Sequence, residues 1–139
     1  MKVNILSIIL VLFLFSLSSC SCSKNVYLKS HVMDMAQKVD PTATEILDEK
    51  LNLQNKCIDY GRNCVRGFGA KIRGLEMVFI EFESESDARQ EAIRIDGYYK
   101  YNWVMDDITG EPMLERFVVK VYGATRPRLE LEKAEKAEN

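Results

Sequence analysis

The chain has 139 residues, of which 47% are hydrophobic and 29% are charged, and its formal net charge is −2 at pH 7. This balance excludes the strongly basic field typical of nucleic-acid-binding proteins and provides no acidic tract for a cationic partner. About 120 residues remain once an N-terminal leader is removed, enough for one domain with a modest core. We therefore expect a single folded domain that binds no nucleic acid.

The first 19 residues have the layout of an export signal. Lys2 supplies a positive charge, residues 3–17 are almost wholly apolar, and the small residues Ser18 and Ser19 follow. A membrane-spanning helix needs about 20 apolar residues, whereas this run is shorter and lacks flanking stop-transfer charges. We therefore expect residues 1–19 to be a signal peptide that is cleaved.

The end of this leader, Leu17-Ser18-Ser19-Cys20, resembles the lipobox of bacterial lipoproteins. In that family the cysteine thiol receives a diacylglycerol and the signal is cut just before it. The resemblance therefore implies that Cys20 is lipidated and begins the mature chain. Two acyl chains are enough for stable anchoring, at about 0.8 kcal/mol per buried CH₂. Ser21 stands where an aspartate would favour the inner membrane, so the resemblance implies the outer membrane, facing the periplasm.

Two alternatives to lipidation of Cys20 remain open. Cys22 is a second candidate for the lipid, although the residue three positions before it is Ser19, which is not aliphatic. The leader also fits an ordinary secretory signal, in which case Cys20 and Cys22 would form disulfides.

The region after the leader predicts a tether followed by a domain. Residues 20–40 are expected to form a lipid-anchored tether that is partly helical, and residues 41–124 a single α+β domain. The helical spacing in the tether is carried by Val32, Met35, Ala36 and Val39. In the domain, Pro41 and the Thr42-x-x-Glu45 capping box predict a first helix from about Thr42 to Gln54.

Cys57 and Cys64 enclose a turn-rich segment, which predicts a disulfide between them in an exported chain. With Cys20 lipidated, Cys22 would then be left unpaired. A zinc site is disfavoured because structural zinc sites use tighter Cys-x₂₋₄-Cys spacing, and His31, the sole histidine, is not placed to complete one. We expect no metal and no cofactor.

A strand and a helix are predicted next. Residues 75–82 (LEMVFIEF) are apolar on both faces at their centre, which is typical of an inner strand covered on both sides. Ser84 can cap the following helix, in which Ala88, Ala92 and Ile95 recur at helical spacing. Gly97 is expected to end this helix as its C′ glycine.

The remaining residues predict a C-terminal β-hairpin and a tail. Residues 98–105 alternate with period two, as expected of one strand, and residues 106–112 have turn chemistry. Phe117, Val119 and Val121 are predicted to face one side of a second strand that ends near Tyr122. Residues 125–139 are expected to be a charged tail, either a frayed surface helix or disordered.

Two resemblances imply a ferredoxin-like plait. Phe79-Ile80-Glu81-Phe82, with Asp87-Ala88 and Gly97 after it, resembles the third strand and second helix of the RNA-recognition motif. Arg66-Gly67-Phe68-Gly69 also resembles the opening of that strand signature, but Ala70 replaces its second stacking aromatic. We expect only the fold to carry over, as a strand-helix-strand core plus a C-terminal hairpin, because an exported acidic protein is a poor host for RNA stacking.

The second resemblance is to SPOR domains, plait-fold modules that bind septal glycan in the bacterial envelope. It rests on Phe82, Ser84, Asp87 and Ala88, in a Phe-x-Ser-x-x-Asp-Ala pattern. It implies, as an alternative, a module that binds peptidoglycan.

Two sets of side chains are candidate binding sites. Tyr99, Tyr101 and Trp103 could stack on sugar rings or dock a protein partner, but aromatic residues on a strand are also typical of a core. The second set is Arg62, Arg66, Lys71 and Arg73, with no acidic residue between Gly61 and Gly74. These cations could bind an anion or form a solvated loop.

No catalytic residue is assigned. The sequence has no Gly-x-Ser-x-Gly elbow and no phosphate-cradling loop. The enzymatic alternative is a minor hydrolase that uses two carboxylates across a cleft. We expect a non-enzymatic envelope lipoprotein with a binding or structural role. Its expected partner is membrane lipid through Cys20, and peptidoglycan or another envelope protein is a further candidate.

Overall fold

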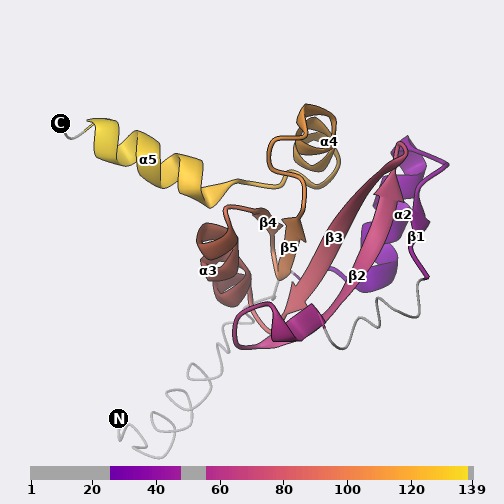
Figure 1. Ribbon diagram of the computed structural model, residues 1–139, viewed down its shortest axis with the longest axis horizontal. Coiled ribbons are helices and arrows are strands. Elements are labelled where there is room, and N and C mark those ends of the chain that lie inside the picture. Colours follow the sequence, from indigo (N-terminus) through magenta and orange to yellow (C-terminus); the bar gives the residue numbers. More distant parts are fainter. Residues whose placement is uncertain (1–25, 48–55, 138–139) are drawn as a thin grey trace, which may run out of the picture.

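The computed structural model describes residues 26–47 and 56–137, and it shows an α+β fold with a five-stranded antiparallel sheet (Figure 1). The helices are α2 (Lys29–Val39), the 3₁₀ helix η2 (Lys56–Ile58), α3 (Glu85–Ile95), α4 (Pro112–Tyr122) and α5 (Pro127–Ala137). The strands are β1 (Thr44–Glu45), β2 (Cys64–Ile72), β3 (Leu75–Phe82), β4 (Tyr98–Lys100) and β5 (Trp103–Asp106). None of the helices in these two stretches is long and apolar enough to span a bilayer.

The strand order in the sheet is β1-β2-β3-β5-β4, and every neighbouring pair is antiparallel. β3 is therefore the central strand. Its side chains alternate between two buried clusters: Met77 and Phe79 belong to one, and Val78, Ile80 and Phe82 belong to the other. The prediction of an inner strand covered on both faces is confirmed.

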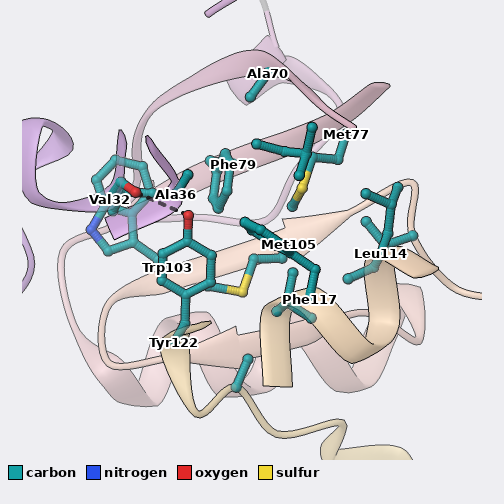
Figure 2. Close-up of a cluster of buried hydrophobic side chains, with 14 of the residues drawn as sticks. Val32, Ala36, Ala70, Met77, Phe79, Trp103, Met105, Leu114, Phe117 and Tyr122 are labelled. Carbon is teal, nitrogen blue, oxygen red and sulfur yellow. Dashed lines mark hydrogen bonds between the residues drawn. The ribbon is translucent and has the colours of Figure 1, made fainter. Parts of the chain in front are cut away.

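Helices cover both faces of the sheet. The smaller cluster packs Ala88 and Ala92 of α3 against β3 and β5. The larger cluster joins α2 and α4 to the opposite face, and Figure 2 shows several of its members, among them Phe79, Trp103 and Tyr122. In this cluster the hydroxyl of Tyr122 on α4 donates a hydrogen bond to the backbone carbonyl of Val32 on α2, at 2.9 Å. This bond ties the two helices together beneath the sheet.

α2 belongs to the folded domain, because its residues Val32, Met33 and Ala36 are buried in the larger cluster. The expected helix in residues 20–40 is present over Lys29–Val39, but it packs as part of the core and the domain begins earlier than residue 41. The sequence pattern placed the domain boundary too late because it treated this short amphipathic helix as part of a spacer.

The helix predicted from Thr42 to Gln54 is wrong at its start. Thr44 and Glu45 form β1, which pairs with Lys71 and Ala70 of β2. The hydroxyl of Thr42 does not cap a helix; it donates to the carboxylate of Asp40 at 2.6 Å. Cross-strand pairing with a distant segment outweighs the local capping pattern here. Residues 48–54 of that prediction lie outside the described residues.

α3 is confirmed with its predicted cap, since the Ser84 hydroxyl accepts a hydrogen bond from the backbone N–H of Asp87 at 3.1 Å. The predicted role of Gly97 is wrong by one position. The left-handed residue is Asp96, with φ of 59°, a conformation that aspartate tolerates better than most residues. A Cβ on Gly97 would lie 3.1 Å from the backbone oxygen of Met105, so close packing explains the glycine.

The single strand predicted over residues 98–105 is instead the β4–β5 hairpin. The chain turns at Tyr101, which has a left-handed φ of 52°, and Lys100 pairs with Trp103. The turn preserves an alternating pattern in the sequence while reversing the chain direction, so periodicity alone could not reveal it.

The second strand of the predicted hairpin is wrong, because residues 112–122 form α4. Pro112 lies in the first turn of this helix and Gly123 ends it with a left-handed φ of 64°. The buried face consists of Leu114, Phe117, Val118 and Tyr122, at the spacing of one side of a helix. Phe117, Val119 and Val121 alternate as they would in a strand. The segment is nevertheless a helix, because it is the residues at helical spacing that are buried.

The C-terminal residues form α5, an exposed helix that extends away from the sheet (Figure 1). Its approach is fixed by Thr125, which exchanges backbone hydrogen bonds of 2.9 Å with Tyr99. The expected surface helix is therefore present, and the segment just before it is attached to the edge of the sheet.

Candidate functional site

The disulfide between Cys57 and Cys64 is confirmed, with 5.5 Å between the two Cα atoms. It closes a loop that begins in η2 and ends at the start of β2. The sequence found this pair because the intervening residues have the composition of a turn.

Three hydrogen bonds made by side chains help to dock the disulfide loop onto the domain. The Tyr60 hydroxyl donates to Asp106 Oδ2 at 2.7 Å, and Asn63 Nδ2 donates to Asp87 Oδ1 at 3.1 Å. The guanidinium of Arg94 donates to the backbone carbonyl of Asp59 at 3.2 Å. Burial, with the bond to Asp106 next, raises the pKa of Tyr60, so this phenol stays protonated at neutral pH.

A cleft of about 420 Å³ lies between the disulfide loop and α3. Its lining combines a charged rim with the ring of Phe82, and consists of Gly61, Arg62, Asn63, Phe82, Asp87, Gln90, Glu91 and Arg94. Gly61 lies close to Glu91, since a Cβ on Gly61 would lie 2.7 Å from Glu91 Oε2 and would displace the end of that side chain.

Two carboxylates, Asp87 and Glu91, line this cleft one helical turn apart. Hydrogen bonds from Ser84 and Asn63 lower the pKa of Asp87. Glu91 is buried and ion-paired with Arg94. A general acid in glycoside hydrolysis needs a raised pKa, and the environment of Asp87 acts in the opposite direction. Asp87 is therefore poorly suited to act as such an acid.

The four cations of the predicted anion site do not converge. They lie along and beyond β2 rather than in the expected loop: Arg62 lines the cleft, whereas Arg73 lies past the opposite end of the strand. Arg66 is paired with the buried carboxylate of Glu81. Lys71 is exposed and is cross-strand from Glu76.

The predicted aromatic surface is also divided. Trp103 is fully buried, and its indole N–H donates to the carbonyl of Tyr27 at 2.8 Å. Tyr99 packs against the smaller cluster on the opposite face of the sheet. Only Tyr101 remains at the edge, where its ring meets Tyr27 edge-on at 4.7 Å. The three residues therefore present no common stacking surface.

Arg73 instead lies beside two cations that the sequence analysis did not select. Arg73, Arg116 and Lys120 line a hollow of about 210 Å³ between the β2–β3 turn and α4. The sequence did not indicate Arg116 and Lys120 because their segment was predicted to be a strand. Only in a helix do these two residues lie one turn apart. The proline at the start of α4 and the glycine after it were the available signals.

Within residues 26–47 and 56–137, no three His, Cys, Asp or Glu side chains are grouped so as to hold a metal ion. Cys20 and Cys22 lie outside this part of the chain. Comparison of the chain with protein-family models, curated proteins and solved structures gave no significant match.

Proposed function

We propose that this protein is a bacterial envelope lipoprotein, anchored through Cys20, whose domain acts by binding or by structural association and not as an enzyme. The motif Leu17-Ser18-Ser19-Cys20 carries the proposal. The Cys57–Cys64 disulfide supports it, because such bonds form and persist in oxidising compartments such as the periplasm.

Residues 26–28, which follow Cys20 by a few positions, suit a nearby membrane. Tyr27 is held by the β4–β5 turn, since its N–H donates to Asn102 Oδ1 at 3.2 Å and its carbonyl accepts from Trp103. The apolar side chains of Val26 and Leu28, on either side of it, are exposed. Tyrosine rings flanked by apolar side chains are favoured at the headgroup level of a bilayer. In this arrangement the β4–β5 end of the domain faces the membrane.

The fold that accompanies this proposal is a ferredoxin-like plait with an added helical layer. β3, α3 and β4 form a unit in which β5 lies between the two parallel strands, and this split β-α-β arrangement recurs in such plaits. α2 and α4 would then be additions that cover the second face.

Intact-mass measurement of the membrane-extracted protein tests the anchor. We expect a lipid-sized mass increment on a chain that begins at Cys20, lost in Cys20→Ser and retained in the matched variant Cys22→Ser. Detergent-phase partitioning should change in parallel. A soluble, unmodified mature chain would instead identify an ordinary secreted protein with a disulfide.

A SPOR-like peptidoglycan binder is the second candidate, because Phe82 and Asp87 of the resembling motif both line the 420 Å³ cleft beside Arg62. Arg62 is exposed and could pair with a glycan or peptide carboxylate. Purified mature protein should then co-sediment with peptidoglycan sacculi. Arg62→Gln should weaken this binding more than the control Arg89→Gln, which removes the same charge from an exposed position that does not line the cleft. Absence of co-sedimentation would exclude this candidate and leave the anchor proposal untouched.

A further inference from the structure

We propose that the hollow between the β2–β3 turn and α4 is a binding site for a phosphate group, with Arg73, Arg116 and Lys120 as its ligands. We call it the phosphate hollow. It lies at the end of the molecule where the β2–β3 turn, the end of α2 and α4 come together (Figure 1). It goes beyond the proposed function, because it does not depend on whether Cys20 is lipidated.

The lining of the phosphate hollow carries three positive charges and no carboxylate. The other lining residues are Val39, Met113, Phe117 and Val121. Among the described residues, no ion pair involves Arg73, Arg116 or Lys120. Three other arginines of the domain, Arg66, Arg94 and Arg126, are each paired with a carboxylate. The hollow therefore has no carboxylate in its lining, and the nearby carboxylate of Asp40 interacts with the charge of Arg73 without forming an ion pair with it.

Arg116 and Lys120 lie one turn apart on α4, as an i, i+4 pair. Like charges at this spacing oppose helix formation, whereas an anion placed between them removes the repulsion. Both side chains are exposed and free to turn toward a ligand. α4 tolerates this repulsion because the burial of its apolar face stabilises the helix.

Arg73 reaches the hollow from a constrained turn. Its φ is 50° and that of the following Gly74 is 83°, so an arginine occupies a left-handed position that usually favours glycine, asparagine or aspartate. The buried carboxylate of Asp40 accepts the Arg73 backbone N–H at 2.7 Å and holds the turn. The same carboxylate accepts the N–H and the hydroxyl of Thr42. Asp40 is therefore occupied by these groups and forms no ion pair with the guanidinium.

The floor of the hollow is the ring of Phe117, which is buried, and the guanidinium carbon of Arg73 lies 6.0 Å from its centroid. This distance is within the range of a cation–π contact, which orients the planar guanidinium. An apolar floor beneath a cationic rim suits a ligand that combines an anionic group with a short carbon skeleton.

The charges select a phosphate over a carboxylate. Two guanidinium groups can each donate paired hydrogen bonds to phosphate oxygens, and the ammonium supplies a third, compact charge. A carboxylate has two oxygens and one charge, and it would leave part of this set unpaired. The volume of about 210 Å³ is small for a ligand pocket and fits a headgroup or a small phosphate ester.

Such a phosphate could belong to a lipid headgroup or to a soluble ester, and two matched probes distinguish these sources. The full mature protein in zwitterionic detergent would be titrated calorimetrically with glycerol 3-phosphate and with dihexanoyl phosphatidic acid, which carries the same group on acyl chains. Inorganic phosphate and acetate complete the series. Tighter binding of the phosphatidic acid by about tenfold or more would identify a lipid headgroup, and equal affinity would identify a soluble ester.

The double variant Arg116→Gln/Lys120→Gln should weaken phosphate binding at least about tenfold, since it removes two charged hydrogen-bond donors. The matched control Arg89→Gln/Lys133→Gln removes the same charges from exposed positions on α3 and α5 and should change the affinity by no more than about twofold. If the double variant does not fold, Arg116→Gln alone gives the same comparison. No saturable binding of any phosphate probe, an equal loss in the control, or acetate binding as tightly as phosphate would overturn the proposal.

Discussion

Arg126 and Asp96 form a paired ionic contact that clamps the start of α5 to the end of α3. The Nε and Nη2 atoms of the guanidinium donate to the two carboxylate oxygens at 2.9 and 2.5 Å. The side chains are 20% and 28% exposed, so solvent screens the pair only in part. Asp96 is the left-handed cap of α3, and the hydrogen bonds from Arg126 lower the pKa of its carboxyl. The contact therefore stabilises both the cap and the attachment of the C-terminal helix.

Arg126→Gln should destabilise the protein by about 1–2 kcal/mol at pH 7, because a bidentate charge-assisted pair is lost. A carboxyl whose folded pKa is lowered contributes stability above its unfolded pKa, and this contribution is lost as the pH falls through the folded pKa. The difference from wild type should therefore shrink below about pH 4. Urea unfolding across pH measures it, with Arg89→Gln as the control. A difference that persists undiminished in acid would contradict the ionic assignment.

Tyr122→Phe should destabilise the protein by about 1 kcal/mol, because the buried hydroxyl loses its hydrogen bond to the Val32 carbonyl while the ring still fills its place. Chemical denaturation at pH 7 measures the change. Tyr99→Phe is the matched control, since no hydrogen bond of its hydroxyl occurs among the described residues, and it should alter stability by less than about 0.5 kcal/mol. Equal effects in the two variants would show that the α2–α4 bond contributes little.

Alkaline conditions should destabilise the domain through Tyr60. Its pKa is raised by burial and by the bond to Asp106, so the folded protein retains a proton that the unfolded chain loses above about pH 10. The stability associated with this group is fully present below pH 10 and falls above it by up to about 1.4 kcal/mol per pH unit. Unfolding measurements between neutral and strongly alkaline pH should show a shallower decline for Tyr60→Phe than for wild type. If the stability of both proteins declined equally with pH, the Tyr60 hydroxyl would be exposed to solvent in the folded protein.

Breaking the Cys57–Cys64 disulfide should cost about 2.5 kcal/mol, the value that loop-closure entropy assigns to so short a loop. Urea unfolding of the wild type with and without reductant measures this cost. The double variant Cys57→Ala/Cys64→Ala should match the reduced wild type and should not respond to reductant. A response in the double variant would assign the effect to another cysteine.

Trp103 is the sole tryptophan and is fully buried, so its fluorescence reports on the core. Iodide should quench it little until the protein unfolds, and added sugars should leave its emission unchanged. If the aromatic strand formed an exposed ligand surface, iodide would quench the folded protein strongly and sugars would change its emission. Fluorescence titration on the folded and urea-unfolded protein distinguishes the two.

Local patterns predicted part of this fold correctly. β3 follows from a short run that is apolar on both faces, and the start of α3 follows from Ser84 and the spacing of its alanines. The disulfide follows from two cysteines around a turn. Each signal depends on residues close together in the chain, which is why one sequence is enough to detect it.

The same local patterns failed where two periods competed. Residues 117–121 satisfy an alternating pattern, while Leu114, Phe117 and Val118 satisfy a helical one, and only packing against the sheet and α2 chooses between them. In the β4–β5 hairpin, the turn at Tyr101 moves Tyr99 to the opposite face from Trp103. Because of this turn, the predicted aromatic site of Tyr99, Tyr101 and Trp103 does not form a single surface.

The sequence by itself determined the α+β class, the central strand and the cysteine pair, because these depend on composition and on neighbouring residues. Only the tertiary structure decided that α2 joins the core and that Arg73 meets Arg116 and Lys120. The physical reason is that burial is shared among segments far apart in the chain. The free energy of placing one face of a helix against a distant sheet is absent from any local pattern.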